Sequence, residues 1–221
     1  MTEIRTTCYN CYRPMPLCLC STIKSIQTNT KFVILMHPKE FKKTKNGTGH
    51  LTHLSLPNSE LFVDVDFTCH TAVNAILTDE TNLCYVLYPG KESLPLNTQK
   101  IETLGKQLVI FIIDGTWPCS VKMLRLSKNL QCLPKLSFTH TKSSLFQIKE
   151  QPKDFCLSTI ESTLTILELL NGHAMETINE ERFKCFLDPF LAMVEYQIQC
   201  ISHSDQNTLR FKKYAGCSTL C

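Results

Sequence analysis

The chain has 221 residues, of which 43% are hydrophobic and 9% aromatic, and its 23 basic and 20 acidic side chains give a net charge of +3. This composition excludes a disordered chain, and the length allows one medium-sized domain with a sizeable core and a small appendage. The longest apolar run, residues 108–113, is far shorter than the roughly 20 residues that cross a bilayer. Residues 1–9 lack the apolar centre of a signal peptide. We therefore expect a cytoplasmic protein with no membrane segment.

Thirteen cysteines are an unusually high number, and an odd count argues against a closed disulfide framework. Four of them are spaced C-x2-C-x6-C-x-C on a stretch where two prolines disfavour a helix: Cys8, Cys11, Cys18 and Cys20. Four thiolates on such a short loop can surround a zinc ion tetrahedrally. We predict that residues 1–30 form a structural zinc module, and a cluster of redox or unrelated thiols is the alternative.

Beyond this module, short apolar runs alternate with amphipathic or loop segments. Strands are predicted at residues 32–36, 61–65, 83–88, 108–113 and, more weakly, 135–139. Helices are predicted at residues 71–77, 97–105, 118–127, 158–171 and 181–199. Because the strand runs are continuously apolar, they predict an α/β fold with a mainly parallel sheet and flanking helices.

Basic residues are distributed unevenly along this nearly neutral chain. Residues 115–149 contain six basic side chains and no acidic one, and four lysines lie at residues 39–45. Such asymmetry can build one positive face for phosphates, and the alternative is an ordinary solvated helix face.

Polar residues follow the predicted strands at the edge where parallel sheets bind ligands. His37 follows the first strand, and Asp114 follows the fourth, ahead of the only tryptophan of the chain, Trp117. Asp114 is either a functional carboxylate or a turn-former, and in the second case Trp117 fills the core. Ser158 and Glu161 fit a capping box, although a helix N-terminus can also hold an anion. The chain lacks the glycine-rich nucleotide loops, the G-x-S-x-G elbow and the H-E-x-x-H zinc motif.

In this order, these residues resemble the DTW-domain family of tRNA-uridine aminocarboxypropyltransferases, which are related to the SPOUT superfamily of RNA-modifying enzymes. The matching segments are the cysteine module, His37-Pro38-Lys39-Glu40, Leu87-Tyr88-Pro89-Gly90, Asp114-Gly115-Thr116-Trp117 and Leu157-Ser158-Thr159-Ile160-Glu161. Two positions depart from the family pattern. His50 ends a run that resembles Asn-Thr-Gly-Arg, and Lys149 stands where an arginine is expected.

The resemblance implies a SPOUT-like catalytic domain over residues 31–205, a class in which the C-terminal segment can thread a knot, followed by a tail at 206–221. It implies transfer of the 3-amino-3-carboxypropyl group from S-adenosylmethionine to N3 of a uridine in tRNA. Asp114 is then the expected general base, and Trp117 stacks on uracil or walls the adenosine pocket. The expected donor-binding residues are Leu87, Tyr88, Pro89, Asp114, Gly115, Thr116, Leu157, Ser158, Thr159 and Glu161.

The same resemblance predicts a tRNA path lined by basic residues, namely Lys39, Lys42, Lys43, Lys122, Arg125 and Lys149. Two rival functions stay open: an S-adenosylmethionine-dependent SPOUT methyltransferase, and a non-enzymatic zinc-containing RNA-binding protein. The sequence leaves the oligomeric state open, with a monomer favoured.

Overall fold

A computed structural model describes residues 6–42, 47–141, 143–146, 148 and 157–203. Lys43, Lys149 and the tail at 206–221 lie outside this part. The described strands are β1 (Lys31–Met36), β2 (Ser59–Val63), β3 (Asn82–Leu87), β4 (Leu94–Pro95), β5 (Gln107–Asp114) and β6 (Lys135–Ser137). The described helices are η1 (Met15–Leu17), α1 (Pro38–Phe41), α2 (Thr48–Ser55), α3 (Thr71–Thr78), α4 (Trp117–Leu126), α5 (Lys128–Gln131), α6 (Thr159–Gly172), α7 (Glu180–Phe186) and α8 (Asp188–His203).

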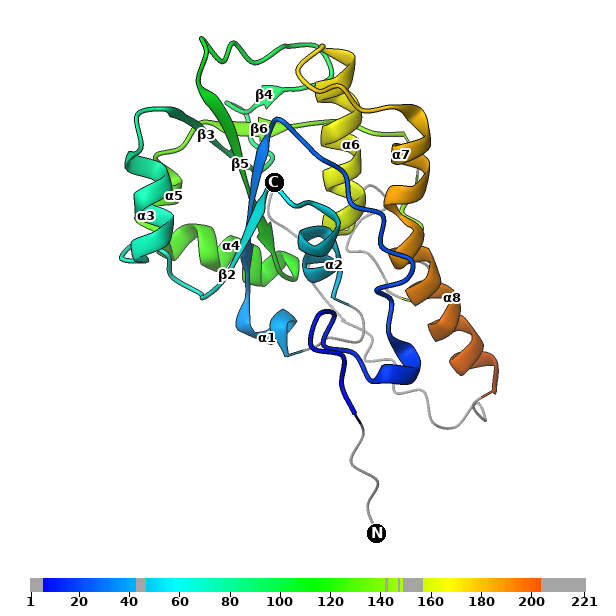
Figure 1. The fold of residues 1–221 in the computed structure, drawn as a ribbon. Helices are drawn as coiled ribbons and strands as arrows, with labels where there is room; N and C mark the ends of the chain where they lie inside the picture. The colour runs from blue at the N-terminus through cyan, green and yellow to red at the C-terminus, as the bar shows by residue number, and fades with distance from the viewer. Residues whose placement is uncertain (1–5, 43–46, 142, 147, 149–156, 204–221) are drawn as a thin grey trace.

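The predicted parallel sheet is confirmed. Its six described strands pair in the order β2-β1-β5-β3-β6-β4, and every pair is parallel. Helices α2, α6, α7 and α8 cover one face, and α3, α4 and α5 cover the other (Figure 1). Each face therefore has its own apolar core, as the continuously apolar strands require.

The alternation of side chains along β5 determines where its last residue points. Ile110 and Ile112 pack into the core beneath α2 and α6, whereas Val109 and Phe111 pack into the core beneath α3 and α4. Asp114 continues the row of Ile110 and Ile112, because side chains two apart share a face of a strand. Its carboxylate therefore meets α2 and α6 at the carboxyl edge of the sheet.

The predicted helix at residues 97–105 is wrong. The Asn97 side chain forms two hydrogen bonds with the backbone of Thr139: it donates to the carbonyl at 2.8 Å and accepts from the amide at 2.7 Å. These bonds attach the segment to the end of β6 and compete with helix formation. Leu104 and Gly105 then turn with φ angles of 49° and 80°. Ile101 is buried although it lies in an irregular segment, and its apolar side chain contributed to the helix-like spacing of residues 97–105.

The single helix predicted at residues 181–199 is divided into α7 and α8. Pro189 has no backbone N–H and lies at the second position of α8, where a proline is tolerated, but it would interrupt a continuous helix. Asn179 caps α7 by accepting from the amide of Arg182 at 3.0 Å. Helices α1 and α2 were not predicted, since each is short and α2 contains a glycine and two histidines.

Residues 6–30, the described part of the predicted zinc module and here called the cysteine segment, pack against the rest of the chain. Leu19 and Ile26 are buried in the same apolar core as α6 and α8, and Ile26 donates its amide to Ser55 at 2.9 Å. The buried guanidinium of Arg13 donates to Met193 Sδ in α8 at 3.3 Å. The division at residues 30 and 205 stays a prediction. No helix within the described residues has the length and apolarity needed to span a bilayer.

Candidate functional site

Asp114 lies at the carboxyl end of β5 and is only 6% exposed. Its backbone carbonyl accepts from the amide of His37, the first residue after β1, at 2.8 Å. Its side chain accepts at Oδ1 from the hydroxyl of Thr159, in the first turn of α6, at 2.5 Å. Asp114 is thus held through its backbone carbonyl by the residue after β1 and through its carboxylate by α6. Such fixing by elements far apart in the sequence is the preorganisation that a catalytic group needs.

Gly49 of α2 forms the wall beside this carboxylate. A Cβ atom at position 49 would lie 2.5 Å from Oδ2 and 2.6 Å from Cγ of Asp114. Glycine is required here for this close approach of backbone to carboxylate. Sequence reasoning missed the roles of Gly49 and Thr159 beside Asp114, and the only signal was that both lie in segments shared with the family.

The predicted capping box at the start of α6 is present. Glu161 is buried, and Oε2 accepts from the amide of Ser158 at 2.9 Å and from its hydroxyl at 2.5 Å. The same carboxylate accepts from the Ser144 hydroxyl at 2.8 Å and the Leu145 amide at 2.7 Å. Glu161 therefore attaches the 143–146 segment to α6, and its predicted contact with the donor stays a prediction.

Tyr88 and Trp117 form an aromatic stack at the same edge of the sheet. Their rings are 5.7 Å apart between centroids and inclined by 13°. Tyr88 follows β3, and its backbone amide donates a hydrogen bond to the Leu136 carbonyl in β6 at 3.0 Å. Trp117 is the first residue of α4. Trp117 is 49% exposed, so it is not a core plug. The stack offers a flat apolar surface next to the Asp114 segment, which suits an adenine or a uracil ring.

The other predicted donor residues surround this edge. The backbone of Gly115 lies close to the first turn of α4, since a Cβ atom at this position would lie 3.2 Å from Cys119 Cβ and 3.3 Å from Ser120 Oγ. Thr116 is the N-cap residue of α4. Leu87, Leu157 and Ser158 are partly or fully buried, and Pro89 is exposed.

The four predicted zinc ligands are brought together. Their sulfur atoms all lie within 4.8 Å of one another, and the Cys8–Cys20 and Cys11–Cys18 pairs are each 3.7 Å apart. With Zn–S bonds of about 2.3 Å, two corners of a regular tetrahedron are separated by about 3.8 Å. The residues therefore fit a tetrahedral zinc ion.

The thiols of this cluster differ in acidity. Hydrogen bonds from the backbone amides of Cys11 and Asn10 lower the pKa of Cys8 to about 6. Burial raises the pKa of Cys20 to about 12, although the Asn10 side chain donates to its sulfur at 3.3 Å. A metal that binds all four as thiolates must therefore displace protons, and its affinity falls as the pH falls.

The predicted RNA-contacting side chains within the described residues are exposed. Lys39 and Lys42 lie on and next to α1, and Lys122 and Arg125 lie on α4. Among the described residues, Lys31 and Glu60 form an ion pair, and none of these four basic side chains forms an ion pair with another described residue. Their contact with RNA phosphates stays a prediction.

A family model for the DTW domain matches residues 5–198. The chain is 28% identical over 204 residues to mouse tRNA-uridine aminocarboxypropyltransferase 2, covering 89% of this chain and 65% of the mouse protein. It is 25% identical over 214 residues to the Drosophila melanogaster protein of that name, covering 93% and 81%. The Macaca fascicularis protein of that name is 26% identical over 209 residues, covering 88% and 64%.

The chain thus spans just under two thirds of the length of the mouse and macaque relatives. No solved structure matches it.

Proposed function

The chain belongs to the DTW domain family, and from this premise we propose that it transfers the 3-amino-3-carboxypropyl group from S-adenosylmethionine to N3 of a uridine in tRNA. The observation that carries the proposal is the Asp114 carboxylate, buried at the ligand-binding edge of the sheet and held by Thr159. It lies in the family's naming motif, near an aromatic stack of which Trp117 is 49% exposed.

The chemical step needs a base and an orientation, because the sulfonium is already a good leaving group. Asp114 accepts the proton from uracil N3, and the electron pair left on N3 forms the bond to the γ-carbon of the aminocarboxypropyl group. The bond from that carbon to sulfur breaks, and its electron pair leaves with sulfur as 5′-methylthioadenosine. Thr159 and Gly49 act through Asp114, since they fix the direction of its carboxylate.

The donor is bound between the Tyr88–Trp117 stack and the start of α6. The stack supplies a flat surface for the adenine ring, and the 14-residue α6 directs its N-terminal dipole toward the donor carboxylate. Zinc in the four-cysteine cluster supplies structural stability. The SPOUT-like threading stays a prediction from the family resemblance.

The by-product tests this function against methyl transfer. The chain is incubated with unmodified tRNA and with donor labelled either in the aminocarboxypropyl carboxyl group or in the methyl group. We expect only the first label to enter tRNA, with 5′-methylthioadenosine as the by-product and a modified uridine in the nucleoside mass spectrum. Methyl label in tRNA with S-adenosylhomocysteine would establish a methyltransferase instead. Donor-independent tRNA binding without either product would leave the RNA-binding alternative.

Replacing Gly49 by alanine is expected to lower kcat/KM by about 10- to 100-fold, because the new methyl group displaces the Asp114 carboxylate. Gly172→Ala is the matched control: this glycine ends α6, and a Cβ there meets nothing within 4 Å. Steady-state kinetics and thermal unfolding of both variants separate a catalytic loss from unfolding. Full activity in Gly49→Ala would contradict the placement of this wall.

A further inference from the structure

A second group of aromatic rings lies across Asp114 from the Tyr88–Trp117 stack. Strand β5 lies between β1 and β3 in the sheet. Tyr88 follows β3, whereas Phe41 and His50 belong to α1 and α2, which follow β1. Along the carboxyl edge of the sheet, one aromatic group therefore lies on the β3 side of Asp114, where Tyr88 packs against the core beneath α3 and α4, and the other lies on the β1 side.

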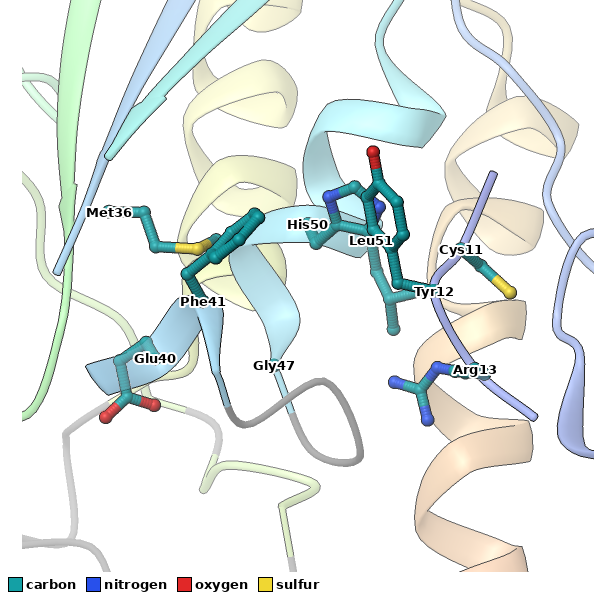
Figure 2. A pocket seen from close by; sticks show the side chains of 9 residues that line it. All are labelled: Cys11, Tyr12, Arg13, Met36, Glu40, Phe41, Gly47, His50 and Leu51. Carbon is teal, nitrogen blue, oxygen red and sulfur yellow. The ribbon is translucent and has the colours of Figure 1, made fainter. Parts of the chain in front are cut away.

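The second group contains Tyr12 of the cysteine segment together with Phe41 and His50 (Figure 2). The Tyr12 and Phe41 rings meet edge to face with centroids 6.3 Å apart, and Tyr12 and His50 are 5.0 Å apart. Tyr12 is 45% exposed and Phe41 43% exposed. The three rings thus form a partly open surface at the junction of the cysteine segment with α1 and α2.

This surface adjoins the catalytic carboxylate through two residues. Met36 lines the same pocket and pairs with Asp114 in the register of β1 and β5. Gly49, which touches the Asp114 carboxylate, directly precedes His50 in α2. A molecule resting on these rings would therefore approach Asp114 from the side opposite the donor.

The pocket is lined by one basic side chain, Arg13, and one acidic side chain, Glu40, and the lysines beside α1 add positive charge for a phosphate. Exposed Lys39 and Lys42 lie on and next to α1, beside Phe41. His50 Nε2 lies 3.0 Å from the Asn10 carbonyl, which can only accept, so Nε2 carries the proton. Burial lowers the pKa of His50 more than this bond raises it, so the ring is neutral and can stack. Its buried Nδ1 is an acceptor with no hydrogen-bond partner among the described residues.

We infer that the surface formed by Tyr12, Phe41 and His50 binds an unpaired base of the acceptor tRNA, while the Tyr88–Trp117 stack serves the donor. This inference rests on the proposed function. Aromatic rings bind unpaired bases by stacking, and nearby lysines hold the phosphates on either side. The cysteine segment thereby has a second role, because it carries Tyr12 into the acceptor site.

Binding of an unmodified tRNA transcript to the full-length, zinc-loaded protein tests this inference without donor. Each of Tyr12→Ala and Phe41→Ala is expected to weaken tRNA binding by roughly tenfold or more. Tyr12→Phe keeps the ring and is expected to bind nearly as wild type. Donor affinity, followed by the fluorescence of the single Trp117, is expected to stay unchanged in all three variants.

Tyr9→Ala is the matched control, since Tyr9 lies in the same segment, is 94% exposed and does not line the pocket. Phe41 lies outside the cysteine segment, so its variant still tests the inference if Tyr12→Ala loses metal. Wild-type tRNA affinity in Phe41→Ala, or a loss no larger than in Tyr9→Ala, would overturn the inference, as would weakened donor binding with unchanged tRNA binding. Ring-dependent tRNA binding by a protein that transfers no aminocarboxypropyl group would overturn only the proposed function.

Discussion

Asp114→Asn is expected to reduce aminocarboxypropyl transfer by about 10²- to 10⁴-fold, because the amide cannot accept the proton from uracil N3. The substitution preserves the size of a side chain that Gly49 encloses tightly, and asparagine can still accept from the Thr159 hydroxyl through its oxygen. The fold and the binding of both substrates are therefore expected to persist. Single-turnover formation of the modified uridine measures the chemical step directly.

Asp64→Asn is the control for this substitution. Asp64 also follows a parallel strand at the same edge of the sheet, but it comes after the edge strand β2 and is exposed. We expect Asp64→Asn to keep wild-type transfer. Unimpaired transfer by Asp114→Asn with normal donor binding would remove Asp114 from the role of base, and the N3 proton would then need another acceptor.

The sheet could be predicted because its strands are apolar on both faces. The runs that became β1, β3 and β5 are continuous, and each was placed to within a residue or two. The 97–105 segment could not be predicted, because its conformation depends on the bond between Asn97 and Thr139, which are 42 residues apart. Local periodicity contains no information about such a contact.

The candidate site shows the same difference between local and tertiary information. The end of a buried strand marks Asp114, and the S-x-x-E spacing predicts the cap that Ser158 and Glu161 form. The contacts of Asp114 with Gly49 and Thr159 arise only when α2 packs against α6 over the sheet. Likewise, Tyr12 reaches Phe41 and His50 only when the cysteine segment folds onto α1 and α2.

Cys11→Ser is expected to cause a large loss of stability. Cys11 is 2% exposed, and its sulfur lies 3.7 Å from that of Cys18, so the serine removes one corner of the tetrahedron from a buried position. Because structural zinc binding is coupled to folding, we expect the substitution to lower the free energy of unfolding by about 4 kcal/mol. In a chain of this size, that decrease lowers the Tm by roughly 10 °C. Metal content and thermal unfolding with and without a chelator measure the effect.

Cys69→Ser and Cys132→Ser are the controls, since both thiols are exposed and lie outside the cluster. They are expected to keep one zinc per chain and the wild-type Tm.

If the cysteine segment presents Tyr12 to the acceptor, chelation at a temperature where the protein stays folded should raise KM for tRNA more than it lowers kcat. A zinc-free protein with an unchanged Tm would show that these thiols have no structural metal, and an equal loss of kcat would show that the metal also supports the Asp114 site.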